Sequence, residues 1–246
     1  MGLTTQVQPV ILPVKGDVVD NDTAEFYDYW GIENYCSPKK VADVLNAANG
    51  APVNVEIASN GGDVFAGSEI YTALKQYSGK VTVNVVGLAA SAASVIAMAG
   101  DTVNIAPTAQ LMIHKAWSGV EGNADDLEHE SGVLNSIDQS IAAAYEAKTG
   151  ISEPDLLQMM STETWMNAKE AVDKGFADGI MFQDEEQPQV MNAVGTTVVP
   201  KATLNKFRNM MVKLADKERP QKKAESKSAI LLRKKLSILR GDKDEH

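Results

Sequence analysis

Residues 87–94 read Gly-Leu-Ala-Ala-Ser-Ala-Ala-Ser, and residues 80–86 before them read Lys-Val-Thr-Val-Asn-Val-Val. The alternating β-branched residues of the earlier stretch predict a strand that enters a core and ends at Gly87. The Ala- and Ile-rich run that follows, up to Gly100, predicts a short buried helix. We therefore expect Ser91 on a strand-to-helix turn, where free N–H groups and the helix dipole favour a developing oxyanion. The turn suits a nucleophile, although a tightly packed buried helix has the same pattern.

A serine hydroxyl needs a general base to become a useful nucleophile. The chain has three histidines, and two of them are weak candidates: His129 lies in a charged helical pattern, and His246 is the last residue of the sequence. His114 ends the apolar run 110–113, which predicts a short strand. A lone histidine there is more often a core residue, but its occurrence together with Ser91 favours the role of base.

A glycine-rich turn lies upstream of both residues. Residues 53–58 predict a strand, Ser59-Asn-Gly-Gly follows it, and residues 65–76 predict a helix. The Asn-Gly-Gly sequence is typical of a turn. It also suits a loop that turns bare backbone N–H groups toward an active site, because glycine lets the backbone come close.

These stretches resemble the proteolytic subunit of the Clp protease family. The resemblance rests on Ser-Asn-Gly-Gly-Asp-Val-Phe-Ala-Gly (59–67), Gly-Leu-Ala-Ala-Ser-Ala-Ala-Ser (87–94) and Leu-Met-Ile-His (111–114), in that order. Residues 164–178, Thr-Trp-Met-Asn-Ala-Lys-Glu-Ala-Val-Asp-Lys-Gly-Phe-Ala-Asp, are similar to the family's closing motif. The resemblance extends roughly from Val10 to Phe182. The Asp-Val-Phe-Ala-Gly and Glu-Thr-Trp motifs are most similar to the head maturation proteases of tailed bacteriophages and prophages.

The resemblance implies a catalytic triad of Ser91, His114 and Glu163. The closing motif places Glu163 where the family has aspartate, and a glutamate can also orient an imidazole and stabilise the imidazolium. Asp155 and Asp173 remain alternatives for this acid, and Glu163 could instead be a helix-capping or surface residue.

The resemblance also implies the groups that bind the substrate. The backbone N–H groups of Gly62 and Ala92 are expected to hold the oxyanion. An extended protein or peptide substrate is expected to pair between the glycine loop and the strand at 110–116. The implied substrate-binding residues are Gly61, Asp63, Val64, Met112, Lys115 and Ala116. This chemistry needs no cofactor and no metal, and the sequence shows neither a phosphate-binding loop nor clustered metal ligands.

Charge divides the sequence in two. Residues 1–200 contain nine lysines, no arginine and 27 acidic residues, a net charge of −18. Residues 201–246 contain 14 basic and six acidic residues, a net charge of +8. We therefore expect a protease domain at 1–183, a polar linker at 184–200 and a basic C-terminal extension at 201–246. The extension is expected to be disordered or mainly helical, with two amphipathic helices at 204–214 and 230–239.

The expected fold class is α/β, a spiral of strand-strand-helix units of the kind that the Clp proteases and the crotonases share. A long amphipathic helix is predicted from an N-cap at Asn123 up to Gly150, because apolar residues recur at helical spacing: Leu127, Leu134, Ile137, Ile141 and Tyr145. In the Clp family the corresponding helix joins two rings, so the resemblance implies a homo-oligomeric ring, heptameric and stacked. The family's inter-ring arginine contacts do not transfer, because residues 1–200 contain no arginine.

Location follows from what the sequence lacks. Cys36 is the only cysteine, so no intramolecular disulfide can form. No apolar run approaches the roughly 18 residues of a membrane span, and the N-terminus has no signal-peptide pattern. We expect a soluble protein in the cytoplasm of a bacterial host, or inside a viral procapsid, with no membrane or nucleic-acid partner.

The expected function is that of a serine endopeptidase that matures phage heads by cleaving capsid or scaffold proteins. In this interpretation the basic extension docks the enzyme onto a capsid or scaffold protein. One alternative is a housekeeping peptidase that works with a separate ATPase unfoldase. A second is a catalytically quiet capsid scaffold. A third is a crotonase-type enzyme, which the pairing of Ser91 with His114 disfavours because enolate chemistry on that fold needs no such pair.

Overall fold

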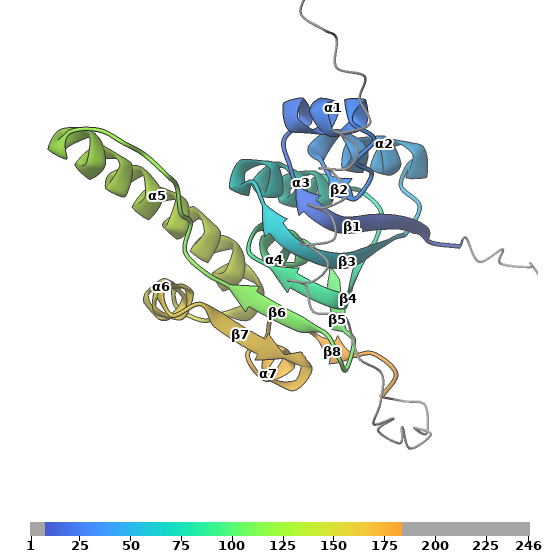
Figure 1. The fold of residues 1–246 in the computed structure, drawn as a ribbon. Helices are drawn as coiled ribbons and strands as arrows, with labels where there is room; N and C mark the ends of the chain where they lie inside the picture. The colour runs from blue at the N-terminus through green and yellow to red at the C-terminus, as the bar shows by residue number, and fades with distance from the viewer. Residues whose placement is uncertain (1–7, 184–246) are drawn as a thin grey trace, which may run out of the picture. The chain divides into compact units, whose positions relative to one another are not determined.

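An eight-stranded sheet, most of it parallel, runs through residues 8–183, the part of the chain that the computed structural model describes (Figure 1). The strands are β1 (Val10–Val18), β2 (Tyr35–Cys36), β3 (Val53–Gly62), β4 (Val81–Ala90), β5 (Thr102–Ile105), β6 (Gln110–Ile113), β7 (Thr164–Asn167) and β8 (Gly179–Ile180). The order along the main path is β2-β1-β3-β4-β5-β8. All pairings are parallel except that of β6 with β7. The fold class is therefore mixed α/β, as the sequence predicted.

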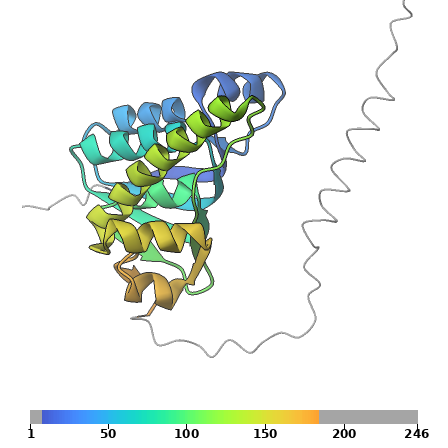
Figure 2. The same cartoon turned by 90° about the vertical axis from the view of Figure 1, so that its left-hand side faces the viewer.

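Seven helices accompany the strands of the described part. They are α1 (Asn21–Tyr29), α2 (Pro38–Ala48), α3 (Val64–Gln76), α4 (Ala92–Ala97), α5 (Ala124–Thr149), α6 (Glu153–Ser161) and α7 (Ala168–Asp173). Figure 2 shows α2, α3 and α5 in front of the strands, so helices cover one face of the sheet. Every residue of α4 is buried, which agrees with the predicted core helix. Strand β3 alternates buried and partly buried residues, and Val53, Val55 and Ile57 have no exposed surface.

Strand β4 has two different partners on one side. Residues 82–85 pair with β5, whereas residues 88–90 pair with β6. The register with β3 shifts between these two halves, because Ile57 pairs with Val85 but Ser59 pairs with Ala89. The strand was predicted to end at Gly87; instead Gly87 lies in this irregular stretch, and β4 continues to Ala90. Because of this change of partner, β4 pairs with β5 in the core and ends beside β6, where Ser91 follows it.

Helix α5 extends away from the sheet, and the segment after β6 runs beside it (Figure 1). The helix begins with a capping box, in which the Asn123 side chain accepts from the Asp126 N–H and the Asp126 carboxylate accepts from the Asn123 N–H. Its buried residues, Asp138, Ile141, Ala142 and Tyr145, all lie in the C-terminal half. The N-terminal half has no buried residue; it contacts the segment after β6 through Glu130, which accepts from the Ser118 hydroxyl.

The N-terminal segment forms a strand and a helix. Strand β1 has nine residues, and Pro13 is tolerated in it because β2 pairs only with Asp17 and Val18 at the far end of β1. The polar, aromatic stretch that follows contains α1, capped by Asp20. Ala24 is the only buried residue of α1, so the helix lacks the apolar stripe by which a sequence pattern is recognised.

Several predicted features lie outside the described residues. They are the linker at 184–200, the basic extension at 201–246 and its two amphipathic helices. Among residues 8–183, no helix is both long enough and apolar enough to cross a membrane.

The reactivity of Cys36 in β2 can be used to test whether this strand is buried. Only 2% of its surface is exposed, and burial raises the pKa of its thiol to about 12. The thiol therefore stays protonated at pH 8, below this raised pKa, and we expect almost no reaction with an aromatic disulfide reagent in the native protein. In urea, one thiol per chain should react. Rapid stoichiometric reaction of the native protein would contradict the burial of β2.

Candidate active site

Ser91 lies between β4 and α4 in an unusual backbone conformation. Its φ is 54° and its ψ is −130°, values that glycine adopts much more readily than serine. The Ser91 N–H donates to the Met112 carbonyl of β6 over 3.0 Å, and its carbonyl accepts from the N–H groups of Ser94 and Val95. Strained residues of this kind often mark functional sites. The hydroxyl is held at a sharp strand-to-helix turn, as the sequence predicted.

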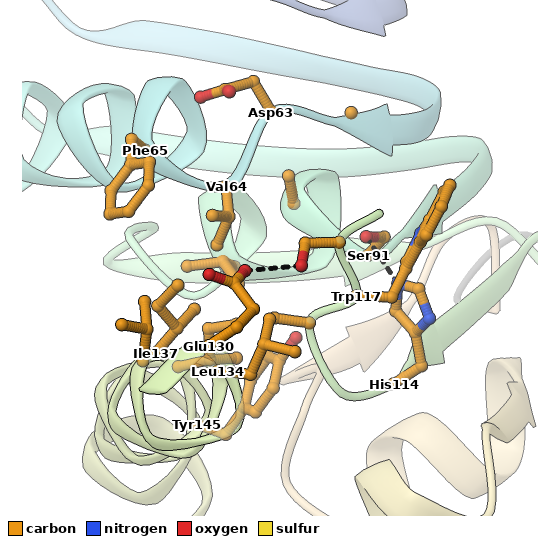
Figure 3. Close-up of a pocket in the computed structure, with 17 residues that line it drawn as sticks. Asp63, Val64, Phe65, Ser91, His114, Trp117, Glu130, Leu134, Ile137 and Tyr145 are labelled. Carbon is orange, nitrogen blue, oxygen red and sulfur yellow. Dashed lines mark hydrogen bonds between the residues drawn. The ribbon is translucent and has the colours of Figure 1, made fainter. Parts of the chain in front are cut away.

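His114 follows β6 directly, and it reaches Ser91 because the two strands are neighbours. Ala90 pairs with Met112 in the parallel ladder, so the residues after each strand emerge side by side. The distance from His114 Nε2 to Ser91 Oγ is 2.7 Å, a hydrogen bond that Figure 3 shows. The structure thus joins the two residues that the sequence singled out as a candidate nucleophile and base.

The segment after His114 is fixed by two helices. The Lys115 N–H donates to the Met160 carbonyl at the end of α6. The Ala116 N–H donates to Asp138 Oδ1 of α5 over 2.8 Å, and Lys115 Nζ lies 3.6 Å from Asp138 Oδ2. Among residues 8–183, Asp138 is the one charged residue classed as buried. A buried carboxylate needs such partners, so the bond and the ion pair tie α5 to the histidine segment.

The glycine loop packs against the Ser91 turn. A Cβ on Gly61 would lie 2.5 Å from the Ala90 carbonyl oxygen and 2.7 Å from Ser91 Cβ. Gly62 has a φ of 152°, and a Cβ there would lie 2.1 Å from the Val18 carbonyl oxygen. No other residue type fits at these two positions. Asp63 then caps α3 by accepting from the Ala66 N–H, so it serves the helix.

Ala92 is the first residue of α4, and it lies next to the glycine loop. A Cβ on Gly61 would lie 2.9 Å from the Ala92 nitrogen, so the glycine loop and the start of α4 meet beside Ser91. The first N–H groups of a helix have no acceptor within the helix. Gly62 and Ala92, the two residues predicted to hold an oxyanion, line one cavity together with Ser91 and His114.

Two cavities open on either side of the Ser91–His114 pair. The first, of about 330 Å³, has a largely apolar wall on α5 formed by Val133, Leu134, Ile137, Ile141 and Tyr145 (Figure 3). The second, of about 580 Å³, lies toward β1 and α1. The residues common to both cavities are Gly62, Asp63, Ser91, His114 and Trp117. A chain passing through both cavities would cross the serine hydroxyl.

The predicted substrate-binding residues are mostly brought together. Val64 and Ala116 line the first cavity with Asp63, and Gly61 and Met112 line the second. Lys115 lines neither cavity, because its side chain pairs with Asp138. Its placement therefore gives no support to a direct contact with a substrate.

Tyr145 supports the serine turn from α5. Its hydroxyl lies 2.8 Å from Ser94 Oγ, and Ser94 Oγ in turn donates to the Ser91 carbonyl over 2.6 Å. Because Ser94 has one proton, the tyrosine hydroxyl is the donor to Ser94. Burial raises the pKa of Tyr145, so the hydroxyl keeps this proton. The sequence placed Tyr145 in an apolar stripe of α5 but could not show that its hydroxyl reaches the serine turn.

Glu163 is close to His114 in the fold but is bonded elsewhere. Its Oε1 accepts from the Trp165 indole N–H over 3.0 Å, and the one hydrogen bond of the His114 ring in the described part is that to Ser91. Ile113 pairs with Thr164 in the antiparallel ladder of β6 and β7, so extending the register by one residue sets Glu163 opposite His114. The alternatives are engaged elsewhere: Asp155 accepts from Ser152, and Asp173 ends α7.

The backbone of Glu163 is also unusual. It follows Thr162, the C-cap of α6, and has a φ of 50°. Glycine is the usual residue at this position of a helix terminus, and a glutamate there costs about 1 kcal/mol. The unfavourable choice suggests that the side chain has a use.

Among residues 8–183, no group of three or more His, Cys, Asp or Glu side chains is arranged to hold a metal ion. What the geometry offers is a hydroxyl paired with an imidazole, next to backbone N–H groups and an apolar cavity. This is the arrangement of the serine hydrolases.

Comparison with known proteins identifies the family of serine hydrolases to which the chain belongs. The profile of the Clp protease family matches residues 39–184. The ATP-dependent Clp protease proteolytic subunit of Deinococcus radiodurans is 30% identical over 136 residues, which cover 54% of this chain and 67% of that protein. The proteolytic subunit 1 of Chlamydia abortus is 34% identical over 137 residues, covering 54% and 71%. The chain therefore belongs to the Clp protease family, and it is a hydrolase of the serine peptidase type.

The strain at Ser91 leads to a test of stability. Ser91→Gly should be more stable than Ser91→Ala by about 1 kcal/mol, because glycine alone adopts this backbone conformation without strain. Urea unfolding of the two variants measures the difference. The matched control is Ser94, inside α4, where the Gly variant should be the less stable by a similar amount. The same sign at both positions would contradict a strained turn at Ser91.

Proposed function

We propose that the chain is a serine endopeptidase in which Ser91, His114 and Glu163 form the catalytic triad. The observation that carries this proposal is the 2.7 Å hydrogen bond between His114 Nε2 and Ser91 Oγ at the meeting point of the two cavities. The family assignment supports the same chemistry.

The reaction follows from the positions of these groups. His114 Nε2 takes the Ser91 proton, and Ser91 Oγ attacks the scissile carbonyl to form a tetrahedral oxyanion. His114 then gives the proton to the leaving amine, and an acyl-enzyme remains on Ser91. Water, activated by the same imidazole, releases the second product. For Nε2 to accept the proton, the neutral imidazole must carry its own proton on Nδ1, the side on which a carboxylate is useful.

The backbone N–H groups of Gly62 and Ala92 are our candidates for the oxyanion hole. The close approach of the glycine loop to the start of α4, beside Ser91, supports this assignment. Each such donor contributes roughly a hundred- to a thousandfold to the rate of known enzymes. Gly62 cannot be tested by simple substitution, because any Cβ collides with the Val18 carbonyl.

Glu163 is our candidate for the acid that orients His114. The β6–β7 register and the unfavourable φ of Glu163 support it. Its second oxygen, Oε2, accepts no hydrogen bond among residues 8–183 and is our candidate partner for Nδ1.

We propose that the substrate is an extended protein segment bound between the glycine loop and the Gln110–Ala116 strand. The two cavities on either side of Ser91 support this path. Gly61, Asp63, Val64, Met112 and Ala116 are the lining residues in our proposal. The apolar wall on α5 suits a hydrophobic substrate side chain.

The biological role that we propose is maturation of phage heads by cleavage of capsid or scaffold proteins. Support comes from the sequence: the Asp-Val-Phe-Ala-Gly and Glu-Thr-Trp motifs, and the basic residues at 201–246 that could bind an acidic assembly partner. In this proposal residues 1–183 are the protease domain, wound as the strand-strand-helix spiral of the Clp proteases. The enzyme acts in the host cytoplasm or within the procapsid.

A second candidate role is favoured by the relatives. The proteins from Deinococcus radiodurans and Chlamydia abortus are named as ATP-dependent proteolytic subunits. By that analogy the chain would form a homo-oligomeric ring and receive substrates from a separate ATPase unfoldase. The exposed N-terminal half of α5 leaves a surface for contacts between subunits.

The proposed chemistry is tested by labelling with a fluorophosphonate and mass spectrometry. We expect one adduct, on Ser91, and none in Ser91→Ala. His114→Ala should also lose it, because removal of the base costs on the order of a millionfold. Thr72→Ala, on the exposed surface of α3, serves as the control that should label normally. An adduct on another residue, or undiminished labelling of His114→Ala, would reject the assignment.

The biological role is tested by co-expression with the capsid and scaffold proteins of the same phage or prophage. We expect specific cleavage that requires Ser91 and does not require an ATPase. Deleting residues 201–246 should reduce incorporation into assembling particles while leaving fluorophosphonate labelling intact. Cleavage only in the presence of an unfoldase and ATP would instead establish the second candidate role.

A further inference from the structure

We propose that Trp165 is a positioning residue, which holds Glu163 so that its second carboxylate oxygen faces His114. The inference rests on the proposed role of Glu163 as the triad acid. It assigns a purpose to the tryptophan of the Glu-Thr-Trp motif, whose indole reaches neither cavity beside Ser91.

The contact itself is well defined. Trp165 is the second residue of β7, and Glu163 lies in the turn that leads into the strand, two residues before it. The indole Nε1 donates to Glu163 Oε1 over 3.0 Å. Trp165 also pairs with Met112 in the β6–β7 ladder, which fixes its backbone relative to the strand that leads to His114.

Trp165 restrains a side chain that is more flexible than the aspartate found at this position in the family. A glutamate has one more rotatable bond than an aspartate, so it needs an added restraint to present its carboxylate in one orientation. The Glu163 backbone is already fixed, because its N–H and that of Lys115 both donate to the Met160 carbonyl. What remains free is the side chain, and the indole restrains that part.

The chemistry of the indole suits this task. A carboxylate has two oxygens and can accept several hydrogen bonds, so an occupied Oε1 leaves Oε2 for the imidazole Nδ1–H. The indole N–H is only a donor and cannot accept a proton from His114. It can therefore hold the carboxylate in its charged form without competing for the base. A lysine at this place would add a full positive charge beside the imidazolium that forms in the reaction.

The experiment is a double-mutant cycle on the purified full-length protein. Trp165→Phe keeps an aromatic ring and removes the N–H. We expect its kcat for peptide cleavage and its rate of fluorophosphonate labelling to fall by roughly tenfold, as for loss of a hydrogen bond to a charged group, with little change in KM. Trp30→Phe is the matched control, because Trp30 lies outside both cavities and should label normally.

The second arm uses Glu163→Gly, which removes the carboxylate at a position where glycine relieves backbone strain, so the variant should fold. In that background Trp165→Phe should cause no further loss of labelling, because the tryptophan acts only through the carboxylate. The residual rate stays measurable because loss of a triad acid alone leaves part of the catalysis.

Each outcome bears on one claim. An unchanged kcat in Trp165→Phe would overturn the positioning role. A raised kcat would also overturn it, because the indole would then hold the acid away from His114. An equal loss in both backgrounds would also overturn it, because the effect would then come from packing. Normal labelling of Glu163→Gly would reject Glu163 as the acid while leaving the Ser91–His114 assignment intact.

Discussion

The parallel pairing of residues 88–90 of β4 with β6 is the contact on which the candidate active site depends. It brings the ends of two strands together, so that Ser91 directly follows β4 and His114 directly follows β6. The Ser91 N–H is bonded to Met112 of the same pairing, which fixes the turn as well as its neighbour. The first half of β4 pairs with β5 in the core, and its second half pairs with β6. One continuous strand therefore belongs to the core at one end and to the candidate site at the other.

Backbone groups and glycines that take no part in the proposed reaction hold most of the site in place. Backbone carbonyls of Ser91 and Met160 accept two or more hydrogen bonds each, and they fix the serine turn and the His114 segment. Glycines at 61 and 62 give the space in which the loop meets α4. Ser91 and Glu163 are two of the four non-glycine residues with a positive φ among residues 8–183, and both are candidate catalytic residues.

Sequence patterns predicted the α/β class, the strand-to-helix turn at Ser91 and its partner His114, because these depend on short motifs with a local meaning. They also predicted α5 from its cap and apolar spacing. They missed α1, in which Phe26 and Tyr29 are exposed, and the burial of Asp138, which depends on the path of a distant segment. They also missed the hydrogen bond between Glu163 and Trp165. Glu163 has a positive φ, and no sequence pattern predicted it.

Helix α5 supplies supports to both members of the Ser91–His114 pair. Asp138 holds the segment after His114, and Tyr145, seven residues later and thus on the same face, holds the serine turn through Ser94. One helix therefore supports both the serine turn and the segment that follows the histidine. A rotation or a slide of α5 displaces both supports in concert, so the exposed end of this helix is mechanically linked to the chemistry at the other.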